Sequence, residues 1–341
     1  MTRYLILAEG FSGDRHYGKT MRGVLRYRRE DVAAILDAAR AGEQEEGVPV
    51  VGSVAEGAAL GADTALVGVA TQGGRFPPAW LALLRGCVEL GLDVENGLHV
   101  FLADDPELAA LAAGRGVELR DLRRPPVDLS TATGANLDVP ATIVLTVGSD
   151  CAIGKMTVSL ELDLEARRRG LRSVFVPTGQ TGIAIAGWGI SVDAVVADFV
   201  AGAAERLVVE GHERGGDLLW VEGQGALLHP VYSGVTLGLY HGSVPHALVL
   251  CHEAGHDEIE GAGGGPHRIP PLGELVELHE RIALPARRAR VVAVALNTRH
   301  LEEDAARAAI ARAEAETGLP ADDPVRFGAA ALVDAVLAAA R

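Results

Sequence analysis

Residues 142–166 read TIVLTVGSDCAIGKMTVSLELDLEA, and this stretch decides the fold of the second half of the chain. It begins with a run of β-branched and apolar residues, which is typical of an interior strand in a parallel sheet. A loop bounded by Gly148 and Gly154 follows, and the residues from Lys155 onward predict a helix. Main-chain N–H groups of such a loop gather at the positive end of the helix dipole, where phosphate groups bind well. The stretch therefore predicts a phosphate-binding loop.

The loop departs from the common pattern G-x-x-x-x-G-K-[ST]. One extra residue separates its two glycines, and Met156 replaces the hydroxyl residue that would hold magnesium, with Thr157 one position later. The longer form G-x-x-x-x-x-G-K-T is found in dethiobiotin synthetase-like enzymes, which this loop resembles. The residues expected to contact a bound cofactor are Gly148, Ser149, Asp150, Cys151, Ala152, Ile153, Gly154, Lys155, Met156 and Thr157.

Lysine is nearly absent from the chain. Of the 31 basic Lys and Arg residues, only Lys19 and Lys155 are lysines, and each follows a glycine and precedes a predicted helix. A compact ammonium fits inside a tight loop where the larger guanidinium fork does not. Residues 13–20 also match the shorter phosphate-loop pattern, but they stand apart from the first strand and contain the bulky His16 and Tyr17. For this second loop, phosphate binding, another ligand contact and a structural turn all stay open.

Composition limits the classes of function. The 341 residues are enough for two domains, and a hydrophobic content of 48% with 4% aromatics indicates a core of mostly Ala, Val and Leu. The 42 glycines and many short apolar runs fit an α/β protein. A net charge of −15 argues against a broad surface for nucleic acid or anionic membrane. Three widely spaced cysteines suggest reduced thiols in a cytoplasm. We expect a cytoplasmic protein that acts on a small molecule, without nucleic-acid or membrane partners. The sequence leaves open whether the protein forms a homo-oligomer.

Strand-like and helix-like segments alternate along the whole chain, which predicts mainly parallel sheets. We expect a Rossmann-like domain over residues 1–125, a linker rich in Pro, Ser and Thr over 126–139, and a P-loop NTPase-like domain over 140–341. Asp37 ends the second predicted strand, where dinucleotide-binding folds place a ribose-binding acid. A turn or cap residue is the alternative at that position.

Polar residues follow several strands of the second domain, at the sheet edge where ligands bind in open α/β folds. Thr178, for example, follows the strand at 173–176, and Asp198 lies in a predicted helix over 192–209. For most of these positions a polar turn or a solvated face is the alternative. The candidate substrate contacts are Lys19, Thr178, Gln180, Thr181, Asp198, Gln224 and His252.

Glu222 ends a buried strand and is followed by glycines that allow a ligand to approach, which suits a carboxylate opposite the loop lysine. His229 lies just beyond and either transfers a proton or simply packs under the loop. The candidate catalytic residues are therefore Lys155, Glu222 and His229. Asn297, at the end of a late strand, is expected to meet the purine base of a cofactor.

Residues 252–256 match the zinc-protease pattern H-E-x-x-H. That chemistry needs both histidines on one face of a helix. Here the motif begins at a strand end and contains Gly255, so we expect no helix and no metalloprotease.

Four motifs together resemble a bacterial and archaeal family that joins a Rossmann-like amino-terminal domain to a phosphate-loop domain. They are AEGFSGDRHYGKT at 8–20, GSDCAIGKMT at 148–157, VEGQGALLHP at 221–230 and HALVLCHEAG at 246–255. The family, formerly of unknown function, includes D-glutamate N-acetyltransferases. The resemblance implies acetyl transfer from acetyl-CoA to the amine of D-glutamate or a similar amino acid. The family pattern carries Arg where this chain has His256.

This activity can be assigned to particular residues. A phosphate loop can hold the phosphates of coenzyme A without hydrolysing them, and acyl transfer needs a base and donors for the carbonyl oxygen. Glu222 or His229 would be the base, and loop N–H groups or Gln224 would be the donors. Cys151 is either an acyl carrier or a small side chain that fills the loop.

The alternative is an ATP- and magnesium-dependent kinase or ligase of the dethiobiotin-synthetase type, acting on a small carboxylate or amine. Lys155 would then hold the β- and γ-phosphates, and Thr157 and Glu222 would hold the metal. A nucleotide-binding regulator without catalytic activity is a third class, which the many polar strand ends support poorly.

Overall fold

The computed structural model describes residues 2–14, 17–71, 74–77, 79–261 and 267–339. The chain divides into two compact units, one formed by Met1–Pro125 with Gly179–Ala194 and the other by Pro126–Thr178 with Val195–Arg341. Each unit contains one mainly parallel sheet, so the predicted α/β class is confirmed. No helix of the described residues is long and apolar enough to cross a membrane.

The first unit contains a seven-stranded sheet in the order β3-β4-β2-β1-β5-β6-β7. Only the short β3 runs antiparallel to its neighbour. The six parallel strands follow the Rossmann order, in which the chain moves outward on one side of the first strand and then on the other. The strands are β1 (Tyr4–Leu7), β2 (Val32–Leu36), β3 (Gln44–Glu45), β4 (Val48–Val51), β5 (Thr64–Val67), β6 (Asp93–Asn96) and β7 (Leu119–Asp121).

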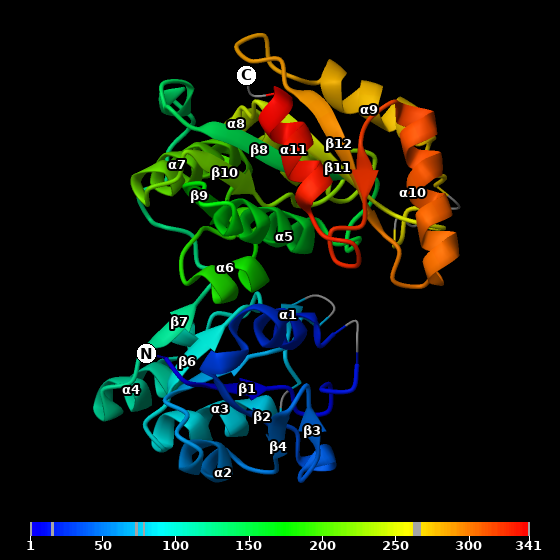
Figure 1. Ribbon diagram of the computed structural model, residues 1–341. Helices are drawn as coiled ribbons and strands as arrows, with labels where there is room; N and C mark the ends of the chain where they lie inside the picture. The colour runs from blue at the N-terminus through cyan, green and yellow to red at the C-terminus, as the bar shows by residue number, and fades with distance from the viewer. Residues whose placement is uncertain (1, 15–16, 72–73, 78, 262–266, 340–341) are drawn as a thin grey trace. The chain divides into compact units, whose positions relative to one another are not determined.

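Helices cover both faces of this sheet (Figure 1). On one face α2 (Val54–Ala59), α3 (Trp80–Glu89) and α4 (Pro106–Arg115) bury an apolar cluster against the strands. On the other face α1 (Lys19–Arg28) and α6 (Gln180–Ala186) pack on a second cluster. At the end of β2, the buried Asp37 carboxylate accepts hydrogen bonds from Ser12, so it fastens the loop after β1 as a structural residue would.

The position of α6 differs from the predicted boundaries. The sequence assigns residues 179–194 to the second domain, whereas they pack within the first unit. Ala184 and Ile185 of α6 join the apolar cluster that α1 forms on the sheet. Among the described residues of 1–125, α1 is the helix that contributes to this cluster, so the short apolar α6 completes its cover. An apolar pattern predicts that a helix is buried, but not which unit buries it.

Arg123 anchors the segment of α6 within the first unit. Its buried guanidinium donates to the Gly97 carbonyl at 2.7 Å and to Gln180 Oε1 at 2.6 Å, and it pairs with Asp193. A buried cation with several partners is costly to remove because the partners stay buried without donors.

We expect Arg123→Ala to lower the free energy of unfolding by about 3 kcal/mol, because Gln180, Asp193 and the Gly97 carbonyl lose their shared donor. Hydrogen exchange of residues 179–194 should also accelerate. Arg115→Ala, which removes an exposed arginine from α4, is the control and should leave the melting temperature unchanged. Equal melting curves for the two variants would contradict this role of Arg123.

The second unit contains a six-stranded sheet in the order β13-β12-β11-β8-β10-β9, and all its paired strands are parallel. The strand that precedes the glycine-bounded loop, β8, lies between β11 and β10. The strands are β8 (Thr142–Gly148), β9 (Ser173–Val176), β10 (Leu218–Val221), β11 (Ala247–Glu253), β12 (Arg290–Asn297) and β13 (Ala321–Asp322).

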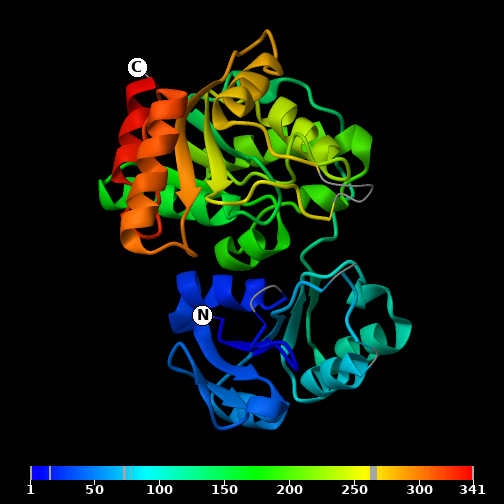
Figure 2. The same ribbon diagram turned by 90° about the vertical axis from the view of Figure 1, so that its right-hand side faces the viewer.

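Two helices, α5 (Lys155–Arg168) and α11 (Ala330–Ala339), pack together over one face of this sheet. The other helices are α7 (Val200–Glu213), α8 (Ser233–Ser243), α9 (Leu272–Arg281) and α10 (Glu303–Thr317). Figure 2 shows the strands of this unit between α11 on one side and α8 on the other. The loops at the carboxyl ends of the strands are thus held by a sheet that is buried on both faces.

Residues 126–139, predicted as a linker, pack on α7 inside the second unit. The buried Glu205 carboxylate accepts the N–H groups of Thr133 and Gly134, and the Asn136 amide donates to the Gly242 carbonyl at 2.6 Å. Glu205 thus holds this segment against α7. A Cβ atom at Gly202 would lie only 1.9 Å from the Ser130 carbonyl oxygen, so the contact requires glycine.

Candidate active site

The loop at 149–154 joins the buried β8 to α5, as the sequence predicts. Ala152 and Gly154 both take positive φ angles, 55° and 110°, which turn successive amides toward the same side. Among the described residues, the six consecutive N–H groups of residues 152–157 donate to no protein acceptor. A concentrated set of main-chain donors at a helix start fits a phosphate or pyrophosphate.

Lys155 is the first residue of α5 and is only 6% exposed. Its Nζ donates to the Asp150 carbonyl at 2.6 Å. Burial lowers the pKa of Lys155, while the neighbouring Asp150 and Glu222 carboxylates and two cysteines act to raise it. Gly148 and Gly223 flank its side chain, since a Cβ atom at either position would lie 3.1 or 3.0 Å from Lys155 Cδ. The space between the two glycines is wide enough for the alkyl chain of a lysine, and this chain places the ammonium beside the loop amides.

Gly223 lets β10 approach β8 closely at the site. Its N–H donates to Thr146 Oγ1 at 2.9 Å, and that hydroxyl is 3.0 Å from Ser159 Oγ on α5. A Cβ atom at Gly223 would lie 1.8 Å from the Thr146 carbonyl oxygen, which belongs to the backbone of a central strand and has no room to move.

We therefore expect Gly223→Ala to push β10 away from β8 and to destabilise the second unit by roughly 3 kcal/mol or more, as overpacking of backbone does. Gly234→Ala is the matched control, because a Cβ atom at that position of α8 meets nothing within 4 Å. Thermal unfolding of both variants checks this. An unchanged melting temperature in Gly223→Ala would contradict the close approach.

Glu222 follows β10 and is 4% exposed. Its Oε2 accepts the N–H of Thr178 at 2.9 Å, and its carbonyl oxygen accepts the Thr178 hydroxyl at 2.7 Å. Thr178 follows β9, which pairs with β10, so the two strand ends hold each other. The Thr178 donors thus position Glu222, and the carboxylate lies near the Lys155 ammonium, whose charge it favours.

His229 is buried, and both of its ring nitrogens have partners. Nε2 lies 3.0 Å from the Glu260 carbonyl, and Nδ1 accepts the N–H of Val231 at 3.1 Å. This arrangement makes His229 a support for the segment that carries Glu260. Because both ring nitrogens are engaged in protein contacts, His229 is a weaker candidate for a general base, which needs a nitrogen that faces the substrate.

The Asp150 carboxylate also holds the segment that carries Glu260. It is fully buried and accepts the N–H of Cys151, His256 Nε2 at 2.8 Å and the N–H of Glu260 at 2.9 Å. The Asp150 carboxylate therefore fastens the loop instead of facing a ligand. Donor atoms of Asp150, Cys151 and His229 lie within 4.8 Å of one another, but those of Asp150 and His229 are already hydrogen bonded.

His252 and Glu253 are the last residues of β11, so the H-E-x-x-H motif does not begin on a helix, as predicted. The Nδ1 of His252 lies 2.9 Å from Ser149 Oγ in the loop. Burial and the neighbouring His256 lower the pKa of His252 below its ordinary value of 6.5. His252 thus fastens Ser149, and its burial favours the neutral ring.

Asn297, the last residue of β12, also contacts the loop. Its Nδ2 donates to the Ile153 carbonyl at 3.3 Å and to Glu253 Oε2 at 3.0 Å, and its Oδ1 accepts the N–H of Arg299. Since the whole side-chain amide has partners, Asn297 is better placed to fasten the loop than to recognise a purine base.

The remaining candidates are spread over both units. Gln224 is half-buried, and among the described residues its side-chain amide hydrogen bonds to no protein group; its main-chain carbonyl accepts the Thr236 hydroxyl. Asp198 is exposed in a short 3-10 turn, because the helix predicted over 192–209 is broken before α7.

The other three lie in the first unit. Lys19 begins α1, Gln180 accepts from Arg123, and Thr181 Oγ1 lies 2.8 Å from Thr20 Oγ1. Residues 15 and 16 of the predicted second loop lie outside the described residues.

Sequence reasoning missed Thr146 and His256 as supports of the site. Thr146 is one of several β-branched residues in a buried strand, and nothing in the pattern marks its hydroxyl. His256 stands in a motif that suggested only a metal site, whereas its partner, Asp150, is more than a hundred residues away in the chain.

Comparisons with known proteins agree with this architecture. A family model described as "Domain of unknown function (DUF1611_C) P-loop domain" matches residues 130–333, and a companion model described as "Rossmann-like domain" (DUF1611_N) matches residues 35–125. The chain belongs to this family. The resemblance drawn from the four sequence motifs is thus confirmed.

Two curated relatives of the chain are each named D-glutamate N-acetyltransferase. The protein from Tritonibacter scottomollicae is 43% identical over 288 residues, which cover 83% of this chain and 84% of the relative. The protein from Pseudoalteromonas sp is 36% identical over 282 residues, which cover 82% of this chain and 83% of the relative. A crystal structure of a DUF1611 family protein from Anabaena variabilis is 42% identical, with a TM-score of 0.91 over 99% of this chain and 100% of that one.

Proposed function

We propose that this protein is an N-acetyltransferase that transfers the acetyl group of acetyl-CoA to the amine of D-glutamate. The names of two relatives that match most of the chain support the reaction. The observation that carries the proposal is the run of six main-chain donors at 152–157 beside the buried Lys155, with the Glu222 carboxylate next to the ammonium.

The residues of the loop fit the pyrophosphate of coenzyme A. Amides 152–157 and the Lys155 ammonium would hold it, and no phosphoryl bond has to break, so a magnesium-binding hydroxyl at Met156 is not needed. Acetyl-CoA supplies an activated thioester. The protein then has to bring an unprotonated amine to the thioester and to stabilise the charge on its oxygen.

Glu222 is the proposed base. It would take a proton from the substrate ammonium, so that the amine forms the new N–C bond while the C–S bond breaks and the thiol leaves with a proton. Thr178 holds the carboxylate in place for this step. The Gln224 amide would donate to the thioester carbonyl oxygen, since among the described residues it hydrogen bonds to no protein group.

An ATP- and magnesium-dependent kinase or ligase is the second candidate. The proximity of Glu222 to Lys155 and the position of Thr157 in the first turn of α5 favour it, because both could hold a metal beside phosphates. The two functions differ in which cofactor bond breaks.

The deciding experiment follows free thiol from acetyl-CoA with D-glutamate as acceptor, with L-glutamate as the matched control. A parallel sample receives ATP, magnesium and D-glutamate, and ADP is measured. We expect thiol release that depends on D-glutamate. ADP release without thiol release would overturn the acetyltransferase in favour of the second candidate.

A further inference from the structure

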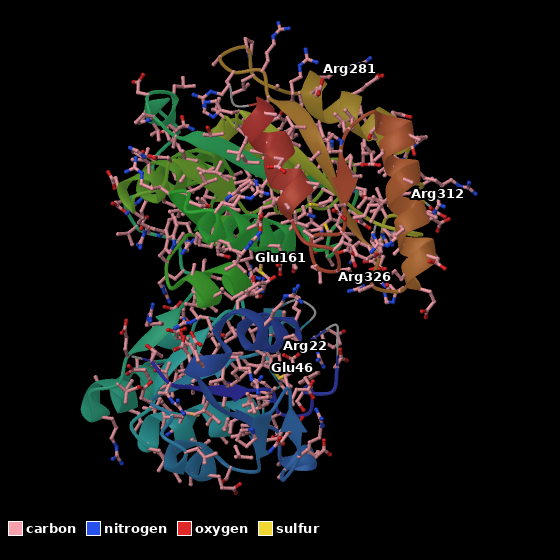
Figure 3. The ribbon with its side chains drawn as sticks, viewed as in Figure 1. Arg22, Glu46, Glu161, Arg281, Arg312 and Arg326 are labelled. Carbon is pink, nitrogen blue, oxygen red and sulfur yellow. The ribbon has the colours of Figure 1, made fainter. Side chains whose placement is uncertain are left out.

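One arginine is fixed by a segment that contacts the phosphate-binding loop, and it has no role in the site described above. Arg326 follows β13, and its Nη1 donates to the carbonyl oxygens of Thr298 at 3.0 Å and Leu301 at 2.7 Å. Both belong to the segment between β12 and α10. Figure 3 labels Arg326 in the segment that joins β13 to α11. The guanidinium is therefore anchored by one nitrogen.

The same segment contacts the loop. Asn297 donates to the Ile153 carbonyl, and the next residue, Thr298, holds Arg326. The buried Asp323 fixes Thr298 by accepting its N–H at 2.9 Å and its hydroxyl at 2.6 Å. A short, rigid chain of contacts thus links the guanidinium to the phosphate-binding loop.

Arg326 differs from its basic neighbours in its partners. Arg299 pairs with Glu253, and Arg307 pairs with Glu303. Within the part of the chain that the structure describes, no carboxylate pairs with Arg326, and its Nε and Nη2 donate to no protein acceptor. In a chain with a net charge of −15, an exposed and anchored arginine without a carboxylate is a ready partner for an anion.

The chemistry of coenzyme A supplies a matching anion. Besides its pyrophosphate, it carries a phosphate on the 3′ hydroxyl of its ribose. The loop amides and Lys155 suit the pyrophosphate, so the 3′-phosphate needs a second cation outside the loop. The fork of an arginine matches phosphate oxygens in a bidentate way, and an anchored fork loses little freedom on binding.

We propose that Arg326 binds the 3′-phosphate of coenzyme A and so selects the acyl donor. The proposal rests on the proposed function, because ATP has no phosphate at that position. It assigns to Arg326 a specificity-determining role that does not touch the reacting atoms.

The test compares two donors, acetyl-CoA and acetyl-3′-dephospho-CoA, in the parent protein and in Arg326→Ala. In the parent, the KM for the dephospho donor should be about tenfold or more above that for acetyl-CoA. Arg326→Ala should raise the KM for acetyl-CoA by about tenfold, leave kcat within about twofold, and leave the KM for the dephospho donor unchanged. The two donors then become equivalent.

The matched control is Arg312→Ala. Arg312 is an exposed arginine on the outer side of α10, where Figure 3 labels it, and its loss should leave both donors unaffected. A purely structural role for Arg326 would weaken both donors equally. That result, or an equal effect of Arg312→Ala, would overturn the proposal.

Calorimetric binding of CoA and 3′-dephospho-CoA separates this site from the reaction. If the parent prefers CoA and Arg326→Ala does not, the site stands even where no acetyl transfer is observed. If acetyl transfer occurs but the preference for CoA does not depend on Arg326, the site is wrong and the proposed function remains.

Discussion

Replacing Lys155 by alanine should lower kcat/KM for acetyl-CoA by roughly ten- to a hundredfold, since a charged hydrogen bond to phosphate contributes about 1.5–3 kcal/mol. The ammonium lies inside the loop and beside six main-chain donors. Among the described residues of the loop, no other side chain can supply a positive charge in its place. Steady-state kinetics with varied acetyl-CoA measure the effect. Most of the loss should appear in KM, because the lysine holds the cofactor.

Stability provides the control for this variant. The buried Lys155 ammonium donates to the Asp150 carbonyl, so the alanine variant should unfold at a somewhat lower temperature, and activities are compared where both proteins stay folded. Lys155→Arg should not restore activity, because Gly148 and Gly223 leave no room around the side chain for a guanidinium. Arg281→Ala, which removes an exposed arginine from α9, should leave activity unchanged. Full activity in Lys155→Ala would contradict phosphate binding by this residue.

Glu222→Gln should lower kcat by about 10²- to 10⁴-fold, which is the range for loss of a general base. The change keeps the size of the side chain and an oxygen that can accept the Thr178 N–H, so the fold and the KM should change little. The pH profile of kcat/KM gives a second readout. In the parent the rate should rise with pH as the base loses its proton, and in the variant this rise should disappear.

His229→Gln tests the other candidate for the general base. Both ring nitrogens of His229 are hydrogen bonded within the protein. This variant should therefore lower the melting temperature, while the rise of kcat/KM with pH should remain. A stable His229→Gln variant without activity, together with an active Glu222→Gln variant, would reverse the two assignments.

The sequence predicted the parts of the site that are local in the chain. A buried strand, a glycine-bounded loop and a helix start occupy consecutive residues, so their pattern alone indicates a phosphate-binding loop. Glu222 could be found because it ends a strand of a parallel sheet, whose strand ends share one edge. The Rossmann-like and phosphate-loop domains follow from the alternation of strands and helices.

The rest depends on partners that the pattern does not contain. Asn297 ends a strand and His229 lies beyond Glu222, as predicted, but their hydrogen bonds go to Ile153 and Glu260, which only the folded chain brings near. The helix α6 is apolar enough to be buried, yet its packing on α1 depends on which face of the first sheet lacks cover. Arg326 is one arginine among many, and only its anchored position distinguishes it.

Hydrogen exchange of the loop tests the central claim most directly. Peptides that cover residues 149–157 are followed by mass spectrometry with and without coenzyme A, in the parent and in Lys155→Ala. The six amides at 152–157 have no protein acceptor among the described residues, so they should exchange quickly in the free protein and slowly once phosphoryl groups accept their hydrogen bonds. Equal exchange with and without saturating coenzyme A in the parent would contradict the account.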